Sequence, residues 1–244
     1  MERSEEKEAI RKRIWRSLEE SGVSRFPRPI KGRIPNFLGA EKAARNLARL
    51  SEFQRARAVK VNPDAPQTPV RKTVLSEGKL LIMPTPRLRR GFLALDPSSI
   101  PGSVLPRAST IKGAFAHGRP ISIEDLSTID LVVAGSVAVS RSGARVGKGG
   151  GYSEIEYGIL RESGLLAEET PIATTVHDLQ VVDNAPVEDH DFLVDIIATP
   201  SEVIRVNRGR RQPSGILWEK VTPKMLEVMP ILREVRKKRV LNQP

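Results

Sequence analysis

The stretch "DLVVAGSVAVSRSGARVGKGGGYSEIEYGIL", residues 130–160, joins an apolar β-branched run, a glycine-rich loop and a helical pattern. The run is apolar on both faces, which is typical of a strand buried inside a sheet, and the spacing from residue 152 predicts an amphipathic helix. Glycines let backbone N–H groups approach an anion closely, and a helix N-terminus adds a favourable dipole. We therefore expect an α/β fold with a ligand-binding loop at the carboxyl end of this strand.

The charged residues around the glycine loop favour a phosphate ligand. Arg145 and Lys148 lie within the loop, and Glu154 or Glu156 at the start of the helix could hold Mg²⁺. Neither standard phosphate motif fits: the spacing before Lys148 is one residue short of a Walker A loop, and the dinucleotide pattern fails for lack of its third glycine. A flexible connector with a solvated lysine is the alternative to a phosphate site.

Further strands and helices alternate along the chain, which predicts a mostly parallel open sheet with helices on both faces. Helices are also expected at both ends, the first beginning at Ser4 as its N-cap and ending at Gly22. Residues 215–221 suggest an edge strand. The expected strands are 58–62, 79–84, 130–139, 170–178 and 194–200, and the expected helices are 4–21, 40–56, 68–77, 107–117, 152–164 and 222–240.

The pattern divides the chain into three segments that we expect to form one structural domain. Residues 1–57 are a helical segment that packs on the core, residues 58–206 are the α/β core, and residues 207–244 add a strand and a basic helix.

Composition limits the possible partners. The net charge of +11 favours polyanionic ligands, and residues 205–239 carry eleven Lys or Arg against three Glu, which allows weak RNA binding through the C-terminal segment. The alternative to RNA binding is that these basic residues stabilise the C-terminus of their own helix by interacting with its dipole. There is no cysteine, so no disulfide partner exists, and without a long apolar run or a signal peptide we expect a cytoplasmic protein that does not span a membrane.

The glycine-loop segment resembles the signature of the 5-formyltetrahydrofolate cyclo-ligase (methenyltetrahydrofolate synthetase) family, in which a strand leads into Arg-x-Gly-x-Gly-x-Gly-Tyr-Tyr-Asp. The resemblance continues in "KEAIRKRI" (7–14), "GKLLIMPTPR" (78–87), "VHDLQVV" (176–182) and "PVEDHDFLVDIIATP" (186–200). "FPRPIKGRIPNF" (26–37) resembles a subfamily, the methenyltetrahydrofolate synthetase domain-containing proteins, whose animal members add a C-terminal RNA-recognition domain. We expect none in this chain, because no aromatic strand pair follows residue 200.

The resemblance implies a three-layer, Rossmann-like fold of the cyclo-ligase or NagB type, and an ATP- and Mg²⁺-dependent ligase that cyclises 5-formyltetrahydrofolate, or a related pterin, to 5,10-methenyltetrahydrofolate. It implies a phosphate site, folate contacts and metal ligands. The phosphate residues are Lys7, Arg11, Arg145, Gly147, Lys148, Gly149, Gly150 and Gly151; the folate residues are Tyr152, Asp64 and Gln180; the metal ligands are Glu154 and Asp191.

The sequence departs from the family pattern mainly in the folate half. Ser153 replaces the second tyrosine of the motif, and Asp64 falls nearest to the family's pterin-orienting Glu. The alternative function is therefore a catalytically altered member that binds nucleotide or RNA. His190 and His177 are possible acid–base groups or ligands. The alternatives are structural: His190 could stabilise a turn, and His177 could cap a strand end.

Overall fold

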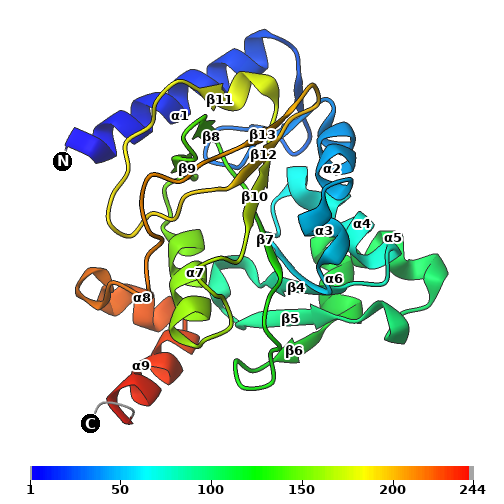
Figure 1. Cartoon of the computed structure of the whole chain (residues 1–244), viewed down its shortest axis with the longest axis vertical. Coiled ribbons are helices and arrows are strands. Elements are labelled where there is room, and N and C mark those ends of the chain that lie inside the picture. The colour runs from blue at the N-terminus through cyan, green and yellow to red at the C-terminus, as the bar shows by residue number, and fades with distance from the viewer. Residues whose placement is uncertain (1, 242–244) are drawn as a thin grey trace.

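The computed structural model describes residues 2–241, and a mixed sheet forms its centre (Figure 1). The five strands from β12 to β4 are parallel, because helical connections return the chain to the same edge, and antiparallel strands complete both ends. In spatial order the strands are β13 (Val203–Arg205), β12 (Ile196–Ala198), β10 (Ile172–Thr175), β7 (Leu131–Ala134), β3 (Ala58–Val61), β4 (Leu80–Pro84), β5 (Phe92–Leu95) and β6 (Arg119–Ile121).

Helices cover both faces of this sheet. Neighbouring residues of each central strand therefore point into opposite cores. In β3, Ala58 joins the core beneath α7 and α9, whereas Val59 and Val61 join the core beneath α2, α4, α5 and α6. The structure thus confirms the three-layer α/β fold. The helices are α1 (Glu2–Glu20), α2 (Ala40–Ala48), α3 (Ser51–Arg55), α4 (Thr68–Ser76), α5 (Leu105–Ala108), α6 (Ile111–His117), α7 (Tyr152–Glu162), α8 (Pro223–Val228) and α9 (Ile231–Leu241).

The prediction of one strand over 130–139 is wrong, because the run bends between β7 and a second strand, β8 (Ala138–Ser140). A Cβ at Gly135 in the bend would lie 2.9 Å from Gln67 Oε1 and 3.1 Å from Asp64 Oδ2, so the backbone passes too close for a side chain. β8 leaves the main sheet and pairs with β9 (Arg145–Val146) and β11 (Val181–Val182). α1 packs on this small sheet through a core that includes Ile14 and Leu18.

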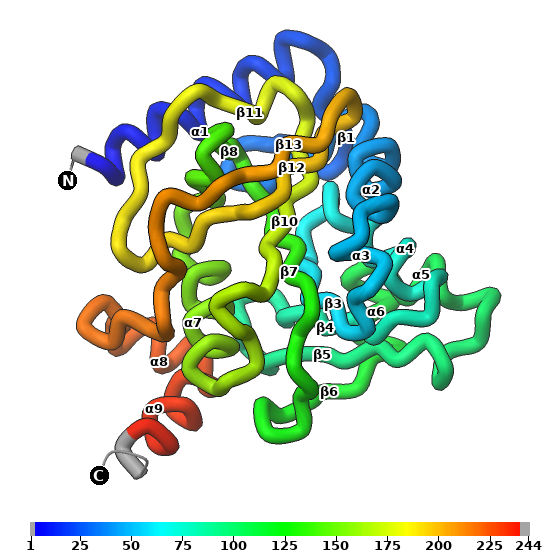
Figure 2. Tube along the Cα trace, viewed as in Figure 1, coloured from blue at the N-terminus to red at the C-terminus, as the bar shows by residue number. Residues whose placement is uncertain are grey.

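Several predicted helices differ from those in the structure. α1 begins at Glu2, so Ser4 lies inside the helix and is not its N-cap. The expected helices at 40–56 and 107–117 are each two helices, α2 with α3 and α5 with α6. The terminal helix also breaks in two at Pro230, because proline cannot donate the backbone hydrogen bond that a continuous helix needs there. Figure 2 shows the chain turning between α8 and α9.

The predicted edge strand at 215–221 is wrong. This segment contains a short 3₁₀ turn at Trp218–Lys220, and the Trp218 indole Nε1 donates to both oxygens of Glu162 at 3.1 Å. The true edge strand on that side is β13, and a further two-stranded ribbon, β1 (Ser24–Arg25) with β2 (Asn36–Phe37), lies between α1 and α2.

The three-segment division of the chain stays a prediction, and the outer residues of its end segments, 1 and 242–244, lie outside the described residues. Within residues 2–241, every helix is too short or too polar to cross a bilayer.

Candidate functional site

The glycine loop links β9 to the first turn of α7. Gly149 and Gly151 have φ angles of +95° and +66°, in the left-handed region that residues with a Cβ rarely adopt. A Cβ at Gly147 would lie 2.9 Å from an Arg145 guanidinium nitrogen. The loop therefore needs its glycines both for conformation and for contact with basic side chains.

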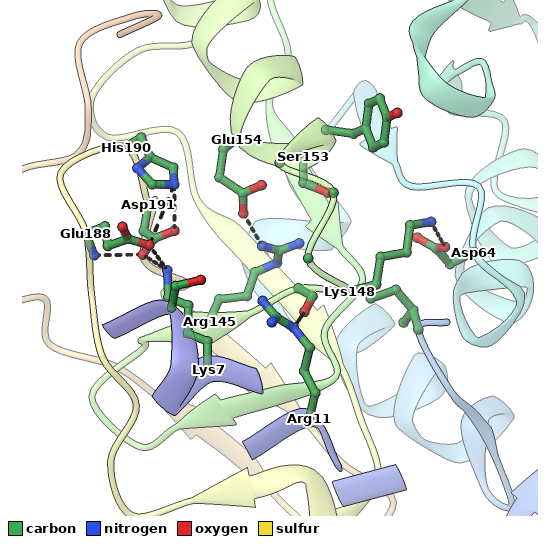
Figure 3. Close-up of a pocket in the computed structure, with 17 residues that line it drawn as sticks. Lys7, Arg11, Asp64, Arg145, Lys148, Ser153, Glu154, Glu188, His190 and Asp191 are labelled. Carbon is green, nitrogen blue, oxygen red and sulfur yellow. Dashed lines mark hydrogen bonds and ion pairs between the residues drawn. The ribbon is translucent and has the colours of Figure 1, made fainter. Parts of the chain in front are cut away.

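Four basic side chains from two distant parts of the chain line one cavity of about 240 Å³ together with this loop (Figure 3). Lys7 and Arg11 come from α1, and Arg145 and Lys148 flank the first loop glycine. Arg11 Nε donates to the carbonyl of Gly147 at 2.7 Å, which fixes α1 against the loop. The structure thus places together all eight residues that the sequence analysis assigns to phosphate.

Each of these cations contacts a carboxylate. Lys7 Nζ lies 2.5 Å from Asp191 and 2.9 Å from Glu188, and Arg145 donates to Glu154 at 2.6 Å. Burial alone would raise the pKa of Glu154, but the adjacent Arg145 guanidinium outweighs it and leaves the pKa lowered. The hydrogen bond from Lys7 likewise lowers the pKa of Glu188. Glu154 and Glu188 are therefore ionised at neutral pH and set the side-chain positions of Arg145 and Lys7.

One group of potential metal ligands borders the same cavity. Glu188, His190 and Asp191 each offer a ligand atom, and these atoms lie within 4.8 Å of one another. Two carboxylates fit Mg²⁺, which prefers oxygen ligands. Glu154 lines the cavity too, and its Oε1 accepts from Arg145, as Glu188 Oε2 and Asp191 Oδ2 accept from Lys7. Glu188 was missed by the sequence analysis, although it stands in the quoted "PVEDHD" segment.

A second, larger cavity of about 1170 Å³ adjoins the first. Asp64, Lys148, Tyr152 and Ser153 line both cavities. Lys148 Nζ contacts Asp64 Oδ1 at 3.1 Å, and the Lys148 side chain is 42% exposed, so this ion pair stands at the junction. The remaining wall is proline-rich and mixes apolar with charged side chains. It includes Phe26, Pro27, Ile34, Pro63, Pro69, Pro86, Pro106 and Ile111, and also Arg33, Glu41, Arg71, Lys72 and Arg87.

A buried polar network borders the larger cavity, and its lysine was missed by the sequence analysis. Lys60 Nζ, in the middle of β3, donates to Glu156 Oε2 at 2.7 Å and to Asn62 Oδ1 at 3.0 Å. Asn62 Nδ2 in turn lies 3.2 Å from Glu156 Oε2 and 3.2 Å from Ser153 Oγ. A lysine inside the apolar run "AVKVN" was the available sequence signal, since an unpaired charge cannot be buried there.

Two of the predicted residues have structural partners and are absent from the linings of both cavities. The Gln180 amide donates to the carbonyls of Ser136 and Val137 and its oxygen accepts from the backbone of His177, so it ties β10 to the bend after β7. His177 caps the 3₁₀ turn Asp178–Gln180, and burial lowers its pKa. His190 does line the smaller cavity, and its Nδ1 lies 3.1 Å from Lys220 Nζ.

Comparison with known proteins shows which sequences this chain resembles. The sequence profile of the 5-formyltetrahydrofolate cyclo-ligase family matches residues 3–200. The chain is 45% identical over 234 residues to a methenyltetrahydrofolate synthase domain-containing protein of Bos taurus, covering 94% of this chain and 62% of that protein. The corresponding Mus musculus protein is 45% identical over 236 residues, covering 95% and 63%. The chain thus spans less than two thirds of the length of these relatives.

One solved structure bears on the fold. The NMR structure of Aquifex aeolicus 5,10-methenyltetrahydrofolate synthetase superposes with a TM-score of 0.53 at 22% sequence identity, covering 84% of this chain and 94% of that chain. At that identity the likeness supports the α/β architecture.

Proposed function

This chain belongs to the 5-formyltetrahydrofolate cyclo-ligase family, and we propose that it uses ATP and Mg²⁺ to close 5-formyltetrahydrofolate, or a related pterin, to the 5,10-methenyl form. The observation that carries the proposal is the convergence of Lys7, Arg11, Arg145 and Lys148 with the glycine loop in one cavity. The larger cavity beside it has room for a second, bulkier substrate.

The smaller cavity suits the triphosphate. Backbone N–H groups of the glycine loop and the N-terminus of α7 favour negative charge, and the four basic side chains neutralise the phosphoryl oxygens. Asp191 and Glu188 would hold Mg²⁺, which supplies further neutralisation of the phosphate charge when bound. Lys7 then stands between these carboxylates and the phosphates and holds both in place.

The larger cavity suits the folate, with Tyr152 as one wall at the junction. In the proposed reaction the formyl oxygen attacks the γ-phosphorus, an O–P bond forms, and the bond to the ADP oxygen breaks. N10 then attacks the activated formyl carbon, loses its proton, and inorganic phosphate leaves with the former formyl oxygen. Lys148 lies where the two cavities meet, so its ammonium can move from Asp64 to the transferring phosphoryl group.

The test is a spectrophotometric assay for the methenyl product from 5-formyltetrahydrofolate, with and without ATP. We expect ATP-dependent product, and a loss of about 10²–10³-fold in kcat for Lys148→Ala, because one charge contact to the transition state is removed. Lys12→Ala removes an exposed charge from α1 outside both cavities and serves as the control with unchanged rate. Product without ATP, or an unaffected Lys148→Ala enzyme, would contradict the proposal.

The second function, nucleotide or RNA binding without turnover, would be favoured by ATP binding without product. The basic C-terminal helix α9 and the N-terminal helix α1 lie at opposite ends of the view in Figure 1. Part of the charge on α9 is also neutralised within the chain, because Lys238 pairs with Glu124 and Arg239 lies 3.7 Å from Glu162. RNA binding by this segment stays a prediction, which a filter-binding titration at two salt concentrations would check.

A further inference from the structure

A carboxylate in the larger cavity has one oxygen that no described residue uses. Glu156 Oε2 accepts from Lys60 and from Asn62, whereas no hydrogen bond from residues 2–241 reaches Oε1. The Oε1 atom is also not among the fully buried atoms that lack a partner, so it keeps access to the cavity that Glu156 lines. The side chain as a whole is only 5% exposed.

The surroundings of this oxygen fix it in place. Glu156 is on α7 and Lys60 is on β3, and their 2.7 Å ion pair holds the carboxylate against the sheet. Burial raises the pKa of Glu156, and the charge of Lys60, 2.7 Å from Oε2, acts in the opposite direction. A carboxylate held in this way, out of bulk water, makes stronger hydrogen bonds to N–H donors than an exposed one does.

Ser153 places a donor close to this acceptor. Its Oγ accepts from Asn62 Nδ2 at 3.2 Å, which leaves the hydroxyl proton free for a ligand carbonyl. Ser153 lines the same cavity. The wall therefore offers an anionic acceptor and a neutral donor, linked to each other through Asn62.

Two other carboxylates line this cavity: Glu41, which is exposed, and Asp64, which is less suited to the same task. Asp64 Oδ1 is paired with Lys148 at 3.1 Å, at the junction of the two cavities. Its position also depends on a lysine that the proposed phosphate site uses. Glu156, in contrast, is paired with Lys60, which is buried in the sheet and lines neither cavity.

We propose that Glu156, supported by Lys60 and Asn62, is the specificity-determining residue that binds a 2-amino-4-oxopyrimidine ring edge through its free oxygen, with Ser153 donating to the ring carbonyl. This edge carries a ring N–H beside an exocyclic NH₂, and both pterins and guanine have it. The inference deepens the proposed function, on which it rests for the identity of the larger cavity as a pterin site.

The experiment measures by calorimetry how strongly binding depends on the ligand's 2-amino group. The pterin arm compares 5-formyltetrahydrofolate with its 2-desamino-2-methyl analogue, and the guanine arm compares GMP with IMP. For the wild-type chain we expect the analogue lacking the amino group to bind about 10- to 100-fold more weakly, in whichever arm contains the ring that the cavity binds. A wild-type chain that does not discriminate in either arm overturns the proposal without any variant.

Two variants assign the discrimination to a residue. In Glu156→Gln the preference for the ligand with the 2-amino group should fall to less than about threefold. In Asp64→Asn the preference should persist, because the charge-assisted hydrogen bond is made by Glu156. Should Glu156→Gln fold poorly, the double variant Lys60→Met/Glu156→Leu removes both charges and keeps the buried volume, and it should also lose discrimination. Discrimination that survives in Glu156→Gln, or disappears in Asp64→Asn alone, overturns the proposal.

The two proposals fail in different ways. Tight, discriminating binding of 5-formyltetrahydrofolate that depends on Asp64 contradicts the role of Glu156 and leaves the proposed reaction intact. Discrimination by Glu156 in the guanine arm alone, with no folate binding, contradicts the proposed reaction and supports Glu156 as the determinant for a guanine ligand.

Discussion

Lys60 lies in the middle of a central parallel strand with its side chain 3% exposed, a position normally occupied by Val or Ile. Removing a charge from water is costly, so a buried lysine persists only with a close partner and further hydrogen bonds. Glu156 and Asn62 supply both. Lys60, Glu156 and Asn62 therefore depend on one another for their contribution to stability.

Lys60→Met should lower the free energy of unfolding by about 3–5 kcal/mol, because it leaves Glu156 buried without a counter-charge. Lys60→Met/Glu156→Leu should recover most of that loss, since a well-packed apolar pair replaces a buried ion pair at little cost. Urea unfolding followed by circular dichroism measures both.

The matched control for this prediction is Arg141→Ala, which breaks an exposed ion pair with Glu202 and should change the free energy of unfolding by less than about 1 kcal/mol. A double variant that is no more stable than Lys60→Met would show that the network contributes more than its charges.

The sequence predicts the grouping of residues around the glycine loop better than the buried network, for a physical reason. Gly149 and Gly151 are identifiable because few residues tolerate their backbone conformation, and Lys148 lies among them. Lys60 and Glu156 are 96 residues apart, and no local pattern indicates that they meet. Only the packing of α7 on β3 places them together.

At the scale of elements, the strands that the sequence predicts, such as β3 and β10, are buried on both faces, but the sequence misses β5, which is equally buried. Those it misses include β6 and β13, which are three residues long, lie at the edges of the sheet and bury only part of their side chains. Short edge strands lack a continuous apolar run, and Pro120 in β6 further weakens the pattern. Among the broken helices, the break between α8 and α9 lies at Pro230, a local signal that the apolar period alone does not reveal.

α5 and α6 meet at a glycine, and this contact forms part of the larger cavity. A Cβ at Gly113 of α6 would lie 1.9 Å from the carbonyl oxygen of Arg107 in α5, so the two backbones touch. Pro106, Ser109 and Thr110 around this contact line the cavity. The position of the wall thus depends on a residue that does not itself line the cavity.

Gly113→Ala should lower the free energy of unfolding by about 1–3 kcal/mol, because the helices must move apart to admit the methyl group. It should also weaken folate binding more than ATP binding, since only the larger cavity is affected. Thermal unfolding and calorimetry test the two effects. Gly102→Ala, where a Cβ meets open space, is the control, and equal losses for both ligands would contradict this account.

At the scale of the whole molecule, the proposed phosphate site joins parts of the fold that are otherwise separate. α1 packs on the small sheet, and the segment that follows β11 lies beside it in Figure 2. Lys7 contacts Asp191 across the chain, and Arg11 contacts the loop before α7. A ligand bound there therefore stabilises the assembly of all three parts.

ATP with Mg²⁺ at about 100 times its Kd should add about 2.7 kcal/mol to the free energy of unfolding and raise the Tm by roughly 5–10 °C. Lys7→Met should lose most of this rise, because it breaks the link between α1 and the Asp191 segment, whereas Lys12→Ala should retain it. Differential scanning fluorimetry with and without ATP measures the shift. A Lys7→Met chain with the full shift would show that α1 does not take part in binding.

The contact between Lys7 and Asp191 also bears on how the protein is made. The two residues are 184 positions apart, so at ordinary translation rates Lys7 emerges from the ribosome roughly 10–40 s before its partner. During synthesis the amphipathic α1 has neither Asp191 nor the small sheet on which to pack. A nascent chain therefore completes the proposed phosphate site only after residue 191 has emerged.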